Sequence, residues 1–89
     1  MHNTETIWII GASDGIGAAL AEEWAKRGAR LILSARSADQ LHELATSLGA
    51  EHFALPMDVS DSQSRMAAVR EISGIGPLDR IVHMAAIYD

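Results

Sequence analysis

The sequence contains no cysteine among its 89 residues, which excludes disulfides, thiolate nucleophiles and cysteine-ligated metal sites. Basic charge is also scarce, since seven Lys and Arg stand against twelve Asp and Glu and the net charge is -5. Binding to nucleic acid usually needs a basic patch, so we expect neither nucleic acid nor an acidic membrane as a partner. The four histidines show neither the spacing nor the neighbouring carboxylates of a metal site, and we expect no metal.

Long apolar runs are missing as well. The polar residues 1–6 precede a run that is too short for a signal peptide, and no run is long enough to span a bilayer. A cytoplasmic location is compatible with this composition and with the lack of cysteine. The remaining composition is typical of a globular protein, with 48% hydrophobic and 21% charged residues. The length allows one domain, and we expect a single, partial domain over residues 1–89.

Short apolar runs recur along the chain, and we interpret them as strands. Uninterrupted apolar runs are typical of strands buried on both faces, as parallel sheets require. We expect four strands, at Ile7–Ile10, Leu31–Leu33, His52–Leu55 and Ile81–Ile87.

Three segments with helical spacing separate these runs. The first begins at Ile16, places Ile16, Leu20 and Trp24 on its apolar face and ends at Gly28. The second is predicted to be capped by Ser37 and Gln40, to bury Leu41, Leu44 and Leu48, and to end at Gly49. The third is predicted to be capped by Ser60 and Gln63, with Met66, Val69 and Ile72 inside and Gly74–Pro77 as its end.

Alternation of strands and helices predicts an α/β fold with a parallel sheet and right-handed crossovers. In a doubly wound, three-layer fold the strand order would be 3-2-1-4. The fourth strand would then lack an outer neighbour, and a bare apolar edge invites pairing with another chain. We therefore expect either a longer polypeptide or self-association through this strand.

A glycine loop joins the first strand to the first helix. Gly11 would allow the turn at the strand end, Gly15 would let the backbone approach a diphosphate, and Gly17 would let the helix pack closely on the sheet. Backbone N–H groups and the positive end of the helix would then converge on the anion. The loop residues that we expect to contact the cofactor are Gly11, Ser13, Asp14, Gly15, Ile16 and Gly17. The alternative is a tight turn without a ligand.

With this loop, the chain resembles the short-chain dehydrogenase/reductase family, whose Gly-x-x-x-Gly-x-Gly spacing matches Gly11, Gly15 and Gly17. The resemblance continues in order through residues 26–29, 34–37, 58–59 and 78–82, and so covers essentially the whole chain. It implies a Rossmann-type half domain that binds a nicotinamide dinucleotide.

The end of the second strand bears on the choice of dinucleotide. A carboxylate there would bind the ribose hydroxyls of NAD, but Ser34 and Ala35 occupy the position and Arg36 comes next. The planar, charged fork of Arg36 suits a 2'-phosphate, which favours NADP over NAD, although a solvated surface arginine is the alternative. Asp14 opposes this preference, because many NADP-preferring relatives carry a basic residue there; it could instead accept from the following amides.

The resemblance implies further contacts with the cofactor. Asp58 and Val59 fall where the family places an acid and an apolar residue against adenine, whereas Asp58 taken alone is equally well a turn residue. In the family the fourth strand ends in Asn-Asn-Ala-Gly, beneath the nicotinamide ribose. Here residues 83–86 read His-Met-Ala-Ala, so Ala85 is retained and both asparagines are replaced. We expect His83 to be a core residue rather than a catalytic one.

The family's catalytic serine, tyrosine and lysine lie beyond the fourth strand. Tyr88 is the only tyrosine and no lysine comes after it, so we expect that these 89 residues cannot transfer a hydride unaided. The hypothesis is therefore the dinucleotide-binding part of an NADP-dependent oxidoreductase that acts on a carbonyl or alcohol. The alternative is a non-catalytic, nucleotide-binding or self-associating half-Rossmann module.

Overall fold

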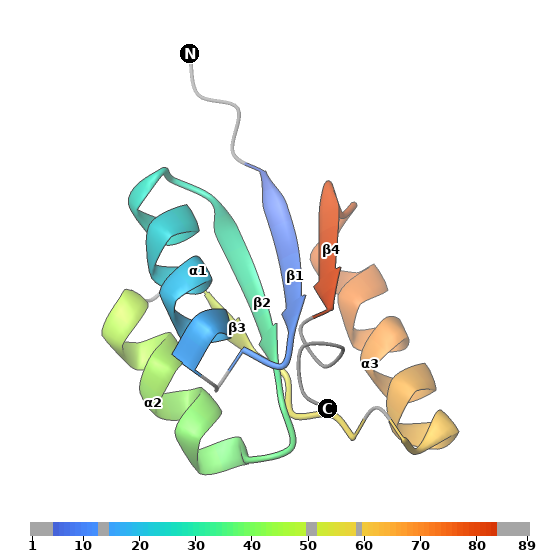
Figure 1. Ribbon diagram of the computed structural model, residues 1–89. Helices are drawn as coiled ribbons and strands as arrows, with labels where there is room; N and C mark the ends of the chain where they lie inside the picture. Colours follow the sequence, from blue (N-terminus) through green and yellow to red (C-terminus); the bar gives the residue numbers. More distant parts are fainter. Residues whose placement is uncertain (1–4, 13–14, 50–51, 59, 84–89) are drawn as a thin grey trace.

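The computed structural model describes residues 5–12, 15–49, 52–58 and 60–83. Within these ranges four strands and three helices alternate, as the sequence predicted (Figure 1). In chain order they are β1 (Thr6–Ile10), α1 (Gly15–Lys26), β2 (Arg30–Ser34), α2 (Ala38–Leu48), β3 (Phe53–Ala54), α3 (Ser62–Ile75) and β4 (Arg80–His83).

The strands form one parallel sheet in the order β3-β2-β1-β4, which confirms the predicted doubly wound topology. Strand β1 is central and pairs with both β2 and β4, so that Ile9 lies between Leu33 and Val82. Strand β3 is short and pairs with β2 alone. At the start of β4, Asp79 is fastened to Thr6: the Thr6 N–H donates to Asp79 Oδ2 at 2.7 Å, and the Asp79 N–H donates to the Thr6 carbonyl at 2.9 Å.

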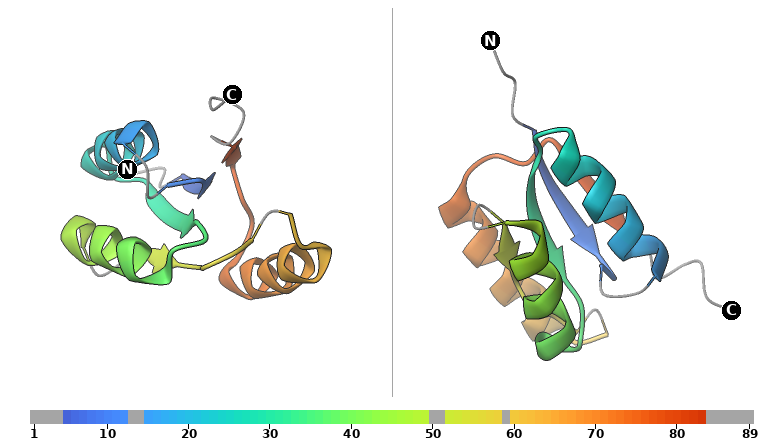
Figure 2. Two further views of the ribbon diagram at one scale, coloured as in Figure 1. Left: turned by 60° about the horizontal axis from the view of Figure 1, so that its bottom comes forward. Right: turned by 90° about the vertical axis from the view of Figure 1, so that its left-hand side faces the viewer.

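Helices cover both faces of the sheet, with α1 and α2 on one face and α3 on the other (Figure 2). Alternate residues of each strand pack on the two faces, because successive side chains of a strand point in opposite directions. Two buried layers result, one on each face of the sheet. The layer under α1 and α2 holds Ile7, Ile9, Leu31 and Leu33, all fully buried. The layer under α3 is smaller; its buried members are Trp8, Ile32, Met57, Ala68 and Ile72.

Helix α2 agrees closely with the sequence expectation. Ser37 is its N-cap, and its Oγ accepts the Gln40 N–H at 3.4 Å. Leu41 is fully buried, while Leu44 and Leu48 pack against the same layer. Gly49 ends the helix.

Helix α1 uses smaller residues for packing than predicted. Ile16 is 52% exposed, so its assignment to the apolar face was wrong. Gly17 and Ala21 are buried instead, whereas Leu20 and Trp24 are only partly buried. Short side chains on the inner side allow the helix axis to lie close to β1, and the larger residues pack at the margins.

Helix α3 departs furthest from the sequence expectation. Its N-cap is Asp61 and not Ser60, and Asp61 Oδ1 accepts the Gln63 N–H at 3.0 Å. The helix also continues through Gly74 to Ile75 and ends at Gly76. Its inner residues are Ala68 and Ile72, one turn apart, so only Ile72 was placed correctly. The other two expected core residues are exposed, Met66 by 59% and Val69 by 55%.

Among the described residues β4 lies at the edge of the sheet without an outer neighbour, as expected, but it is more exposed than its apolar pattern predicted. Ile81 is 59% exposed and His83 is exposed as well, so the expectation of a core histidine was wrong. Only Val82 reaches the buried layer beneath α1. None of the three described helices is both long and apolar enough to cross a bilayer.

Candidate functional site

The residues that the sequence singled out lie just after the carboxyl ends of three neighbouring strands. Gly11 comes directly after β1, Arg36 lies two residues after β2, and Asp58 comes after β3 and a short extension. Because all strands are parallel, these ends meet at one edge of the sheet, where ligands of doubly wound folds bind. The fold therefore collects the predicted contacts along a single edge.

The turn after β1 has the conformation that the glycine predicted. Gly11 has φ of 91°, in the region that favours glycine. Its N–H donates to the Ser34 carbonyl at 2.7 Å, and the Ala12 N–H donates to the same oxygen at 3.1 Å. The first two amides of this bend are therefore tied to β2 and are not available to an anion, which leaves the amides further along the loop and at the start of α1.

The start of α1 supplies the remaining amides. The first N–H groups of a helix have no acceptor within the helix, and the helix dipole is positive at this end. Those of Gly15, Ile16 and Gly17 belong to this first turn. A Cβ added at Gly17 would stand only 2.6 Å from the Gly11 carbonyl oxygen and 3.0 Å from Ala12 Cα, so glycine is required for this close approach of helix and turn.

Ser34 is a residue whose importance the sequence did not reveal. It is fully buried, and its Oγ accepts the Trp8 Nε1–H at 2.8 Å across the sheet. Its carbonyl holds the glycine turn, so one residue fixes both the central strand and the loop beyond it. The signal available in the sequence was a single hydroxyl at the end of an otherwise apolar strand.

Arg36 and Asp58 lie side by side because β2 and β3 continue to pair beyond their regular ends. The Leu55 N–H donates to the Leu33 carbonyl at 2.7 Å, and the Met57 N–H donates to the Ala35 carbonyl at 3.0 Å. Arg36 follows Ala35 and Asp58 follows Met57, so the two charged residues come directly after the last pair of this ladder. A hollow of about 300 Å³ opens here, lined by Arg36, Pro56, Met57, Asp58 and Ser64.

The Asp58 carboxylate is held in place by its own turn. Asp58 Oδ1 accepts the Ser60 Oγ–H at 2.7 Å and the Ser60 N–H at 3.0 Å. These two hydrogen bonds, with the positive charge of Arg36 acting in the same direction, lower the pKa of the Asp58 carboxyl below its ordinary value. Asp58 is therefore an anion at neutral pH. Its role as a turn residue is confirmed by the hydrogen bonds to Ser60, and its contact with adenine stays a prediction.

Four of the predicted site residues lie outside the described residues: Ser13, Asp14, Val59 and Ala85. Ile16 is described and lies on the first turn of α1, half exposed.

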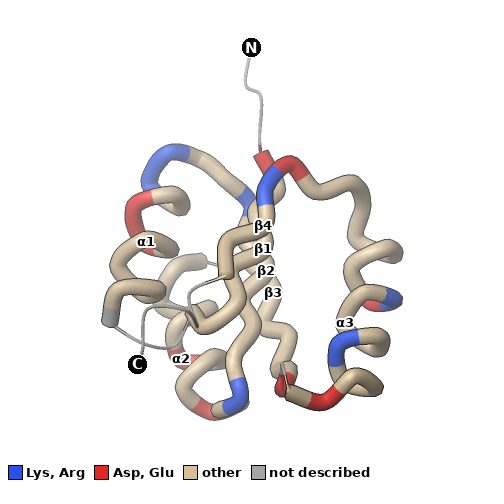
Figure 3. Tube along the Cα trace, turned by 45° about the vertical axis from the view of Figure 1, so that its right-hand side comes forward, with Lys and Arg blue, Asp and Glu red and all other residues tan. Residues whose placement is uncertain are grey.

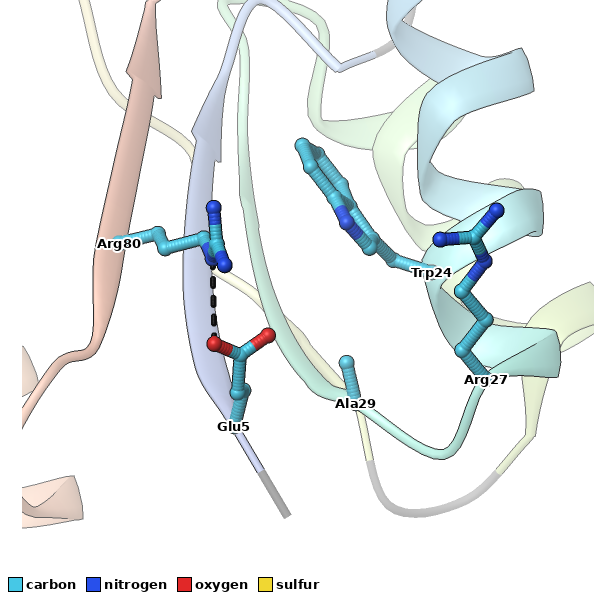
Figure 4. Close-up of a pocket in the computed structure, with 5 residues that line it drawn as sticks. All are labelled: Glu5, Trp24, Arg27, Ala29 and Arg80. Atoms are coloured by element: carbon cyan, nitrogen blue, oxygen red, sulfur yellow. Dashed lines mark hydrogen bonds and ion pairs between the residues drawn. The ribbon is translucent and has the colours of Figure 1, made fainter. Parts of the chain in front are cut away.

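The opposite edge of the sheet has a different character. A hollow of about 230 Å³ there is lined by Glu5, Trp24, Arg27, Ala29 and Arg80, and Figure 4 shows Arg80 paired with Glu5. Arg80 Nε lies 3.1 Å from Glu5 Oε2, and Arg27 Nε lies 3.3 Å from Glu23 Oε2.

Charges of both signs are interspersed along the helices, with no single basic face on the described part of the chain (Figure 3). Over the described ranges no three His, Asp or Glu side chains gather as metal ligands would.

Comparison with known proteins agrees with this geometry. Residues 5–89 match the family model described as short chain dehydrogenase. The chain is 41% identical to 11-beta-hydroxysteroid dehydrogenase A of Arachis hypogaea over 93% of its own length and 25% of that protein. It is similar to L-sorbose reductase of Gluconobacter frateurii, solved with NADPH and L-sorbose, at 37% identity and a TM-score of 0.81 over 89% of this chain and 32% of that one.

A third relative was solved with the other nicotinamide cofactor. It is 3-ketoacyl-(acyl-carrier-protein) reductase of Brucella melitensis, complexed with NADH, at 28% identity and a TM-score of 0.81. The similarity covers 86% of this chain and 32% of the reductase. The chain thus spans about a quarter to a third of the length of these relatives. With the matching family model, the shared topology and the glycine turn between β1 and α1, the chain belongs to the short-chain dehydrogenase family.

Proposed function

We propose that residues 1–89 form the dinucleotide-binding part of an NADP-dependent short-chain oxidoreductase. The observation that carries the proposal is the pairing of Ala35 with Met57, which puts Arg36 and Asp58 on one hollow, at the same end of the parallel sheet as the glycine turn. A cation for a 2'-phosphate and an acceptor for a base amine are thereby available at one end of the site, and helix amides for a diphosphate at the other.

The residues present fit such a cofactor. The close approach at Gly17, which a Cβ would block, brings the amides of Gly15 and Ile16 to the sheet edge, where they would bind the diphosphate together with Ser13 and Asp14. Arg36 would bind the 2'-phosphate, and Asp58 and Val59 would contact the adenine. Ala85 would lie beneath the nicotinamide ribose. The bound cofactor supplies or accepts the hydride, and this part of the protein binds and orients it.

NADP is favoured over NAD by the residues at the carboxyl end of β2. Ser34 and Ala35 are both buried and carry no charge, so no carboxylate stands there to bind the ribose hydroxyls or to repel a phosphate. The exposed Arg36 guanidinium is the nearest charge on that strand, and it faces a hollow and not the protein interior.

The proposed reaction is the interconversion of a carbonyl and an alcohol. Support comes from the relatives, whose names describe dehydrogenases and reductases. The nicotinamide end of the site and the substrate pocket would be completed by further residues, because this chain matches only about a third of each solved relative.

Calorimetric titration of the chain with NADP, NAD and 2',5'-ADP tests the proposal. We expect NADP and 2',5'-ADP to bind more tightly than NAD, and R36Q to weaken both by about tenfold or more while hardly changing NAD, since a charge-assisted contact to phosphate is lost. The matched control is R70Q, which removes an exposed arginine on α3 away from the hollow. Equal affinities for all three ligands would remove the role assigned to Arg36, and no binding at all would overturn the proposal.

A further inference from the structure

Ser64 makes a contact at the hollow that the assigned cofactor contacts do not require. It is the third residue of α3, and its Oγ accepts the Asp58 N–H at 3.0 Å across the turn that precedes the helix. Ser64 also lines the hollow itself, next to Asp58. Another hydroxyl of this helix is used differently: the Ser73 Oγ–H donates to the Arg70 carbonyl one turn earlier, a purely local bond.

The contact completes the immobilisation of Asp58. Its N–H is held by Ser64, its carbonyl accepts the Asp61 N–H at 3.1 Å, and its Oδ1 accepts both donors of Ser60. With backbone and rotamer both fixed, the remaining carboxylate oxygen, Oδ2, is held in one position from which to accept a hydrogen bond. Within this set of contacts, Ser64 is the partner that belongs to α3 itself and not to the turn.

We propose that Ser64 is a positioning residue that sets the preference for the nucleotide base: by holding the Asp58 backbone, it makes the carboxylate select a base with an exocyclic amine over one with an oxygen in its place. This inference rests on the proposed function. Removal of the hydroxyl leaves the Asp58 N–H without its acceptor and frees the turn between β3 and α3 to shift. A shifted carboxylate still carries its charge, so we expect loss of selectivity more than loss of binding.

The test compares NADP with its hypoxanthine analogue, which bears an oxygen where adenine bears the amine. We expect the unaltered chain to bind NADP about three- to tenfold more tightly than the analogue, the range of one net hydrogen bond. In S64A this ratio should fall to near one, with affinity for the analogue unchanged. S64T, which retains the hydroxyl, should restore the ratio, and S73A is the matched control that should leave it unaltered.

Circular dichroism and thermal unfolding of each variant separate positioning from folding. Should S64A unfold, S64C tests the same point, because a thiol keeps the size of the side chain but is a weaker acceptor, and its ratio should lie between those of the unaltered chain and one. A ratio that stays high in a folded S64A or S64C, or an equal loss of both affinities, would overturn the role of Ser64 and leave the proposed function intact. Failure of the unaltered chain to bind either nucleotide would overturn both.

Discussion

The two faces of the sheet are built on different principles. Under α1 and α2, the buried layer is continuous and Gly17 and Ala21 let α1 approach closely. Under α3 the layer is thinner, and this helix turns Met66 and Val69 to the surface. The first face therefore buries more apolar residues than the second. The second face contributes the turn that carries Asp58. On the outer side of α3, Met66 and Val69 stay exposed to solvent.

The largest expected contrast is in core truncation. L33A removes a fully buried side chain under α1 and α2 and should lower the free energy of unfolding by about 2 to 5 kcal/mol. M66A removes a side chain that is 59% exposed on α3 and should change it by less than about 0.5 kcal/mol. Urea unfolding of both variants measures the contrast. A loss in M66A as large as that in L33A would mean that Met66 is packed and not exposed on α3.

The same substitution should have opposite signs in the two helices. G17A brings a Cβ to 2.6 Å from the Gly11 carbonyl, and we expect a loss of about 1 to 3 kcal/mol together with loss of NADP binding. G74A adds a Cβ near the end of α3, where nothing outside its own stretch of helix lies within 4 Å, and should stabilise the chain by about 0.5 kcal/mol. Thermal unfolding and nucleotide titration check both. A neutral G17A would show that the close approach of α1 is not required.

A smaller effect concerns association. We propose that the apolar edge strand β4 pairs with another chain, because Ile81 is 59% exposed there and an uncovered edge offers unpaired backbone groups. Sedimentation velocity should show concentration-dependent association, weakened roughly tenfold by I81K, the scale of one central interface contact. The control is F53K, which alters an exposed apolar residue on β3, the outermost strand on the side of the sheet away from β4. A chain that stays monomeric at high concentration would remove this proposal.

The errors in the sequence interpretation cluster on α3 for a physical reason. Met66 and Val69 have helical spacing, but Ala68 and Ile72 have it too, and no strong apolar stripe in the sequence decides between them. Ser60 and Asp61 are comparable N-caps in isolation. Ser60 is instead engaged by Asp58, a contact that becomes visible only when the turn is folded.

The strands and the strand order were predictable, because uninterrupted apolar runs separated by capped helices leave few alternative topologies. The meeting of Arg36 with Asp58 resulted from the same parallel arrangement. The hydrogen bonds that hold the glycine turn were not predictable. Their acceptor is the backbone carbonyl of Ser34 on the neighbouring strand, and every residue type has such a carbonyl.

That carbonyl has a consequence for the length of ligand the site accepts. The Ser34 oxygen receives the N–H groups of both Gly11 and Ala12, and Arg36 stands two residues further along the same strand. Under the proposed function, this one peptide group would set the spacing between the residues that bind the diphosphate and Arg36, which would bind the 2'-phosphate. Substitutions on the outer side of α3, such as M66A or G74A, should change the free energy of unfolding without altering this spacing, whereas G17A, next to the glycine turn, should lower both stability and affinity.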